Sequence, residues 1–138
     1  MNYLLDTFVL TEFSRRKPAP KLMRWMDSVA EDSLFISAVT IGELQRSIET
    51  LPDSQRKNDL MVWLNEGLKE RLKEHILPLE TVTFTLWGSL TSWKEQAGKP
   101  MGVIETLIAA TALRHNLTIV TNQPEAYLRC GAHVVNPW

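Results

Sequence analysis

Three acidic residues, Asp6, Glu43 and Glu105, lie far apart in the sequence at positions that the fold could bring together. Asp6 directly follows the apolar run Tyr3-Leu4-Leu5, and Glu43 lies in the first turns of the helix expected after the run 34–36. Glu105 stands at the head of a small, apolar helical stretch, where an unpaired carboxylate is costly. Carboxylates are the ligands that hard divalent cations prefer, and a bound cation can activate water against a phosphodiester. We therefore expect a metal site with hydrolytic chemistry.

Two of these acids, Asp6 and Glu43, also have a purely structural interpretation. Asp6 before Thr7 is a typical helix N-cap, and Glu43 in a first helical turn is favoured by the helix dipole. The polar residues that follow the run 117–120, from Thr121 to Gln123, are typical of a turn. The metal-site hypothesis depends on convergence of the three acids. A zinc site is not expected, because Cys130 is the sole cysteine and the three histidines lack ligand spacing.

Short apolar runs alternate with helical periodicity along the chain. The runs 3–5, 34–36, 76–77, 117–120 and 134–135 predict buried strands, because they are brief and mostly bounded by polar or turn residues. Apolar spacing predicts helices around 22–29, 39–51, 60–72, 83–97 and 104–116. Wholly apolar strands alternating with helices are typical of a parallel sheet covered on both faces. The predicted fold class is α/β, with ligands expected at the carboxyl ends of the strands.

Length and composition limit the remaining possibilities. The chain has 138 residues, which suits a single domain over 1–138, and its formal charge of −1 excludes a polybasic nucleic-acid binder. No stretch approaches the length of a transmembrane helix. The lone cysteine and the acidic residue at position 6, which is unlike a secretory signal, favour the cytoplasm.

At these residues the sequence resembles the PIN-domain family, and within it the VapC-type and FitB-type ribonuclease toxins of toxin–antitoxin pairs. The resemblance spans nearly the whole chain and includes the first strand and all three acids. The segments that carry it are Leu4 to Thr7, Thr40 to Leu44, Glu105 to Ala112, Leu117 to Thr121 and Val134 to Trp138. It implies a three-layer α/β/α sandwich with a central, mainly parallel sheet. It also implies a Mg²⁺- or Mn²⁺-dependent endoribonuclease that leaves a 3′-hydroxyl and a 5′-phosphate.

The resemblance further implies site residues and partners. Asp6, Glu43 and Glu105 would be the catalytic and metal-binding residues, supported by Thr7, by Thr121 as a hydrogen-bonding residue and by Gln123 as a neutral oxygen ligand. A cognate antitoxin would bind in the groove between the early helices and block the site. The toxin would form a homodimer that packs through its helices, and could join a higher-order complex with the antitoxin.

Three residues depart from the pattern of the family. Phe8 replaces the usual Asn after the Asp-Thr pair, Glu105 replaces the usual third Asp, and Gln123 is neutral where many relatives carry an acid. These changes leave open a second hypothesis, a catalytically degenerate PIN domain that binds RNA or a partner protein. A metal-dependent phosphatase or DNA nuclease that uses the same acids is a third.

Basic residues near the expected cleft are candidates for holding the RNA backbone. Arg15, Arg16 and Lys17 follow the first helix, and Lys99 precedes the third acid. Because the net charge is close to zero, RNA binding must depend on such local groups.

Overall fold

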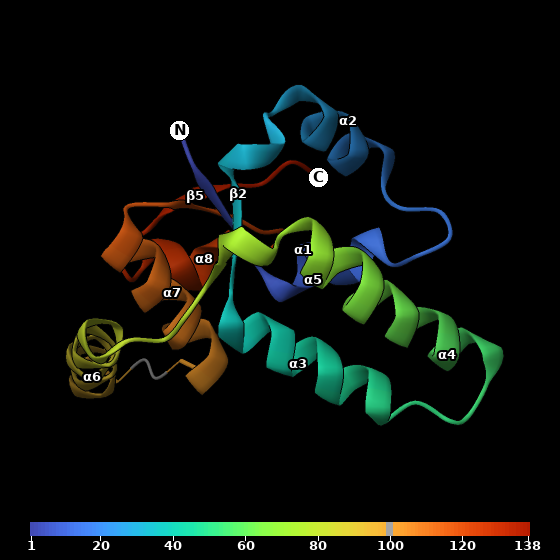
Figure 1. Ribbon diagram of the computed structural model, residues 1–138. Helices are drawn as coiled ribbons and strands as arrows, with labels where there is room; N and C mark the ends of the chain where they lie inside the picture. The colour runs from blue at the N-terminus through green and yellow to red at the C-terminus, as the bar shows by residue number, and fades with distance from the viewer. Residues whose placement is uncertain (99–100) are drawn as a thin grey trace.

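The computed structural model describes residues 1–98 and 101–138, so the predicted RNA-binding residue Lys99 lies outside the described residues (Figure 1). Its sheet has five strands in the order β3-β2-β1-β4-β5, and every paired neighbour is parallel. The strands are β1 (Tyr3–Leu5), β2 (Leu34–Ser37), β3 (Ile76–Leu77), β4 (Thr118–Val120) and β5 (His133–Val135). The prediction of an α/β fold with a parallel sheet is confirmed.

Alternate residues of the strands pack into two separate hydrophobic cores. Leu4 is paired in register with Phe35 and Ile119, and these side chains belong to one hydrophobic cluster. Leu5, Ile36 and Val120 belong to the other cluster. Because successive side chains of a strand point to opposite faces, the two clusters lie on opposite faces of the sheet. Both faces are apolar, which is why the strands read as uninterrupted hydrophobic runs.

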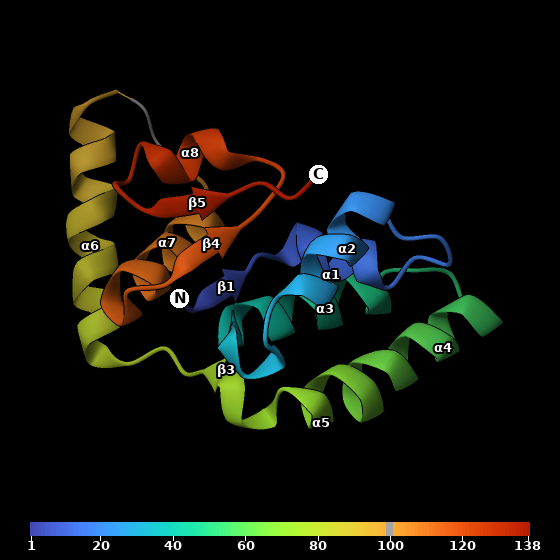
Figure 2. The ribbon, with the colours of Figure 1, turned by 90° about the horizontal axis from the view of Figure 1, so that it is seen from above.

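Helices cover both faces, and Figure 2 shows the sheet between them. One layer holds α1 (Thr7–Phe13), α2 (Pro20–Ser28), α3 (Ala38–Glu49) and a long segment made of α4 (Gln55–Val62), a π-helical stretch (Trp63–Leu68) and α5 (Lys69–Arg71). The other holds α6 (Thr81–Gln96), α7 (Val103–His115) and α8 (Pro124–Leu128). Short 3₁₀ turns, Glu31–Ser33 and Lys73–His75, precede β2 and β3. The predicted three-layer α/β/α sandwich is confirmed.

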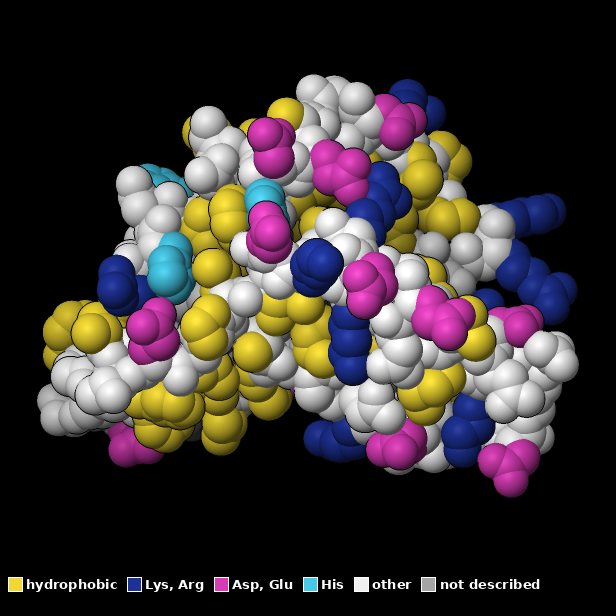
Figure 3. Space-filling view, in the orientation of Figure 1, with side chains coloured by type: hydrophobic (Ala, Val, Ile, Leu, Met, Phe, Trp, Pro, Cys, Tyr) yellow, Lys and Arg dark blue, Asp and Glu magenta, His cyan; other side chains and the backbone are white. Residues whose placement is uncertain are grey.

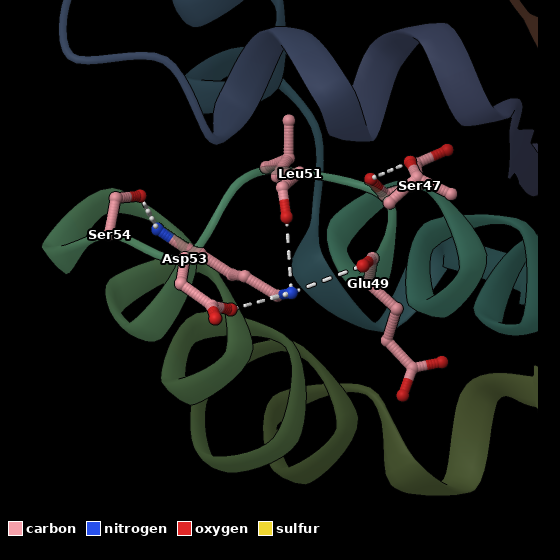
Figure 4. A network of polar contacts seen from close by, with 7 residues as sticks. Ser47, Glu49, Leu51, Asp53 and Ser54 are labelled. Atoms are coloured by element: carbon pink, nitrogen blue, oxygen red, sulfur yellow. Dashed lines mark hydrogen bonds and ion pairs between the residues drawn. The ribbon is translucent and has the colours of Figure 1, made fainter.

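Helix ends are fixed by local side-chain and backbone chemistry. Lys57 Nζ donates to the backbone carbonyl oxygens of Glu49 and Leu51, both at 3.1 Å, which satisfies acceptors at the end of α3 (Figure 4). Ser54 caps α4 by accepting a hydrogen bond from the Lys57 N–H. At the end of α7, Asn116 adopts a left-handed conformation with φ 55°, which turns the chain directly into β4.

None of the helices in residues 1–98 and 101–138 is both long enough and apolar enough to cross a lipid bilayer.

Candidate active site

Asp6 lies at the carboxyl end of the central strand β1. Its backbone N–H donates to the carbonyl oxygen of Val120 at 3.2 Å, which extends the pairing of β1 with β4. The side chain is 1% exposed, and its Oδ1 accepts a hydrogen bond from the Val9 N–H at 3.1 Å. Oδ2 is also buried and finds no partner among the described residues. Asp6 is therefore a helix cap through one oxygen, while the other makes no hydrogen bond within the described residues.

The electrostatic environment of Asp6 disfavours its charge. Burial raises the pKa of the Asp6 carboxyl above its ordinary range, and the charge of Glu43 raises it further. The nearby Thr121 hydroxyl and the backbone N–H groups of Val9 and Phe8 act in the opposite direction and lower the pKa. A buried carboxylate with an unpartnered oxygen is stabilised when a cation supplies the missing charge.

Glu43 is held beside Asp6 by the residue that follows Asp6. Thr7 Oγ1 donates to Glu43 Oε1 at 2.9 Å, so the first residue of α1 fixes a side chain on α3. Ser37 caps α3 by accepting a hydrogen bond from the Val39 N–H, which starts that helix at the end of β2. The second predicted acid is thereby brought to the same edge of the sheet as the first.

Glu105 reaches this edge from the first turn of α7. Thr106, the next residue, is fully buried and accepts a hydrogen bond from Trp87 Nε1 at 2.9 Å. The Thr106 hydroxyl donates to carbonyl oxygens of the preceding turn, at Gly102 and Val103. These contacts tie the start of α7 to α6, and so fix the backbone that carries Glu105.

A pocket of about 370 Å³ opens between these elements. Its lining includes the predicted residues Asp6, Glu105 and Gln123, together with Phe8, Asn122, Pro124, Glu125, Ala126, Tyr127 and Arg129. Glu43 does not line the pocket, although its charge acts on both Asp6 and Tyr127. The supporting residue Thr121 is fully buried, and its Oγ1 accepts a hydrogen bond from the Gln123 N–H at 3.0 Å. Thr121 thus shapes the turn that presents Gln123.

Tyr127 is a site residue that the sequence analysis missed. Its ring is 4% exposed and lines the pocket from α8. Burial raises the pKa of the Tyr127 phenol far above its ordinary value, and the charges of Asp6, Glu105 and Glu43 raise it further. All three predicted acids therefore influence the pKa of the Tyr127 phenol. The sequence does contain a signal for α8, because Pro124 suits the first position of a helix.

The basic residues are arranged differently from the acids. Arg15, Arg16 and Lys17 are exposed after α1, and Arg15 pairs with Glu12 at 3.5 Å, but none of them lines the pocket. Arg129, at the end of α8, supplies a basic side chain to the pocket wall instead. The assignment of Arg15, Arg16 and Lys17 to RNA binding stays a prediction.

The acids in the pocket fit a hard divalent cation that takes only one or two of its ligands from the protein. Across the described ranges 1–98 and 101–138, no three His, Cys, Asp or Glu side chains are grouped so that they could hold a metal ion by themselves. Mg²⁺ commonly binds through one or two carboxylates and keeps waters or substrate phosphate in its other positions. The unpartnered Oδ2 of Asp6 fits that mode, and Glu105 lines the same pocket. The assignment of all three acids as ligands stays a prediction.

The fold and the acids at its edge define a recognised class of protein. The PIN domain family matches residues 3–127. The chain belongs to the PIN domain family.

Particular relatives lie within the toxin branch of this family. The chain is 30% identical to Toxin FitB of Neisseria gonorrhoeae over 98% of this chain and 97% of that protein. It is 26% identical to the VapC ribonuclease Y4jK of Sinorhizobium fredii over 98% of this chain and 96% of that protein. The crystal structure of FitAcB from Neisseria gonorrhoeae superposes with a TM-score of 0.92 at 29% identity and covers 99% of this chain and 98% of that one. The resemblance to VapC-type and FitB-type toxins is confirmed.

Proposed function

We propose that this protein is a metal-dependent endoribonuclease toxin of a toxin–antitoxin pair. The observation that carries the proposal is the buried Asp6 carboxylate at the end of β1, with Oδ2 unpartnered among the described residues and Glu105 on the same pocket. A relative named a ribonuclease and a relative named a toxin support it. We infer that residues 1–138 form one PIN domain, because β5 lies beyond the family match and still pairs with β4.

In this proposal Asp6 and Glu105 would hold a divalent cation, Mg²⁺ or Mn²⁺, at the pocket wall, and Glu43 would act as the third acid beside them. A cation bound there would supply Lewis-acid chemistry, by neutralising phosphate oxygens and lowering the pKa of bound water. Asp6 offers its free Oδ2, while the Val9 N–H keeps Oδ1 and the orientation of the carboxylate fixed. Thr7 holds Glu43 so that it can accept a proton from water through its second oxygen. Gln123 is placed on the pocket wall as a neutral oxygen donor.

We also infer that a cognate antitoxin occupies the groove between the early helices. A cavity of about 620 Å³ lies there, lined by apolar side chains of α1, α2 and the segment after α4, including Leu10, Met26 and Trp63. Asp27 and the ion-paired Glu31 and Arg71 form part of its lining. An amphipathic segment of the antitoxin fits such a groove.

We further propose that the toxin is a homodimer that uses α6. Val82 is 54% exposed and Trp93 is 64% exposed on this helix. Figure 3 shows hydrophobic side chains gathered over α6 and the neighbouring part of α7. Aromatic residues are enriched in the cores of protein interfaces, and an exposed apolar helix favours a partner.

Two observations favour the degenerate alternative, a PIN domain that binds RNA or a partner without cleaving. The described residues hold no preformed group of three metal ligands, and Phe8 stands in the pocket without a hydrogen-bonding group. One experiment distinguishes the toxin ribonuclease from the degenerate domain. Wild-type protein freed of antitoxin is incubated with RNA, DNA and a small phosphate ester, in Mg²⁺ or Mn²⁺, beside Glu105→Asp and Gln123→Asp.

The toxin proposal predicts that the wild type cleaves RNA in preference to the other substrates. A folded wild type that is inert, with cleavage that appears in Glu105→Asp or Gln123→Asp, supports the degenerate domain instead. Preferential hydrolysis of DNA or of the small ester points to the third hypothesis, a DNA nuclease or phosphatase.

A further inference from the structure

We propose that the ring of Phe8 stacks on a base of the RNA strand that enters the pocket. This inference rests on the proposed ribonuclease function and adds a base-stacking residue to the site. It depends on the position of Phe8, on the polar residues that face the same pocket and on the size of that pocket.

Phe8 presents an apolar ring to the pocket. Its neighbours Val9 and Leu10 are buried in the core, whereas Phe8 is 50% exposed. The ring lines the pocket together with Asp6 and Glu105. Exposed aromatic rings beside a nucleic-acid site act as stacking platforms, because every base has a flat π-face.

The lining of the pocket also offers groups that read a base and hold a phosphate. Asn122 and Gln123 carry amides, which both donate and accept hydrogen bonds as base edges do. Arg129 on the same pocket carries a guanidinium, which suits a phosphate oxygen. A base stacked on Phe8 would place its adjoining phosphodiester beside the carboxylates of Asp6 and Glu105.

The size of the pocket favours an unpaired base. Its volume of about 370 Å³ is at the small end of the range for ligand pockets. Bases in an A-form RNA duplex are stacked inside a deep, narrow major groove that side chains do not enter. A ring seated in a pocket therefore reaches a base only where the strand is unpaired.

RNA binding tests this inference directly. The probe is a fluorescent RNA hairpin with a loop of randomised sequence, compared with a fully paired duplex, and both are titrated into Asp6→Asn protein so that cleavage does not interfere. We expect Phe8→Leu to weaken loop binding by roughly tenfold, which lies within the range for one stacked base. Phe8→Trp should retain binding, and Val62→Ala, which alters another exposed apolar side chain on α4, should leave it unchanged.

An abasic loop supplies the matched control on the RNA side. Removing the bases should weaken binding to the Phe8 protein and abolish its difference from Phe8→Leu. Equal loop binding by the Phe8 and Phe8→Leu proteins, or equal binding of duplex and loop, would overturn the inference.

Failure of the inference is distinct from failure of the proposed function. If the wild type cleaves RNA and Asp6→Asn does not, while Phe8→Leu keeps the KM and the product pattern, the inference is wrong and the ribonuclease stands. If binding depends on Phe8 but no metal permits cleavage, the ribonuclease is wrong and the nucleotide pocket stands.

Discussion

The Thr7 hydroxyl donates a 2.9 Å hydrogen bond to Oε1 of Glu43 across 36 positions of sequence. Asp6, the residue before Thr7, caps the same helix α1. One turn of chain at the end of β1 therefore fixes both the first acid and, through Thr7, the second. Side chains that orient metal-binding or catalytic groups in this way commonly affect activity by 10- to 100-fold.

Replacing Thr7 with valine should uncouple Glu43 from Asp6. Thr7→Val keeps the branched shape and removes the hydroxyl, so we expect RNA cleavage to fall by roughly tenfold, within the range for such orienting groups. Thr11→Val, on the exposed side of the same helix, is the matched control. Steady-state kinetics on one defined RNA would check this, and equal rates in Thr7→Val and Thr11→Val would contradict it.

Asp6→Asn should stabilise the fold at neutral pH although it removes activity. Burial raises the folded-state pKa of Asp6, so the native state favours the protonated form and loses stability as pH rises from the ordinary carboxyl pKa of 3.8 through the raised value. The asparagine amide is neutral throughout, and its oxygen can still cap α1. Thermal melts in metal-free buffer should show a higher melting temperature for Asp6→Asn at pH 7 and no such gain near pH 3.

A divalent cation should reverse that difference. Adding Mg²⁺ or Mn²⁺ stabilises the wild type by binding only the native state, whereas Asp6→Asn has lost the anionic ligand. We expect millimolar cation to raise the melting temperature of the wild type alone, and chelation with EDTA to restore the metal-free value. An equal shift in both proteins would place the cation elsewhere.

The hydrogen bond between Trp87 and Thr106, which ties α7 to α6, should contribute measurably to the free energy of unfolding. Trp87→Phe removes the indole N–H that donates to Thr106 Oγ1. A double-mutant cycle with Thr106→Val should give a coupling of about 1 kcal/mol in the free energy of unfolding, as for a typical hydrogen bond. Additive effects of the two substitutions in denaturant titrations would show that the contact does not stabilise the fold.

Tyr127→Phe isolates the function of one hydroxyl in the pocket. The phenol of Tyr127 has a raised pKa and therefore stays protonated at alkaline pH, as a neutral group on the pocket that carries the acids Asp6 and Glu105. We expect roughly tenfold slower cleavage with an unchanged fold, as expected for the loss of one donor in an active site. The difference in ultraviolet absorbance between the two proteins should show no ionisation of Tyr127 until the chain unfolds in alkali.

The exposed face of α6 leads to a prediction about assembly. Trp93→Glu places a charge on the proposed dimer interface, so sedimentation should show a monomer where the wild type is a dimer. Arg24→Glu on α2 introduces the same charge on an exposed position away from α6 and serves as the control. A wild type that sediments as a monomer would contradict the prediction.

Much of the fold follows from local sequence. The strand runs beginning at Tyr3 and Leu34 and the apolar α7 were predicted because a buried parallel sheet requires uninterrupted hydrophobic segments. The helix α8 was missed, since its five residues are too few to show a helical period and its start reads as a turn. Tyr127, which α8 carries, was missed with it.

The candidate site was predictable in part. Asp6 could be placed because it follows a strand, and its cap interpretation is confirmed through Oδ1, while its role as a metal ligand stays a prediction. Glu43 is positioned by a hydrogen bond with Thr7, which no local sequence pattern predicts. The direction of the Phe8 ring depends on which face of α1 packs on the core, and a seven-residue helix leaves that face open in sequence.

The most direct test of the central claim is the cleavage of one structured RNA by antitoxin-free protein, with and without Asp6→Asn, in Mg²⁺ or in EDTA. Analysis of the product ends completes the measurement. We expect the wild type to cleave the RNA in Mg²⁺ and not in EDTA, with 5′-phosphate and 3′-hydroxyl ends. Cleavage that persists in EDTA or in Asp6→Asn, or a folded wild type that leaves RNA intact in both Mg²⁺ and Mn²⁺, would contradict it.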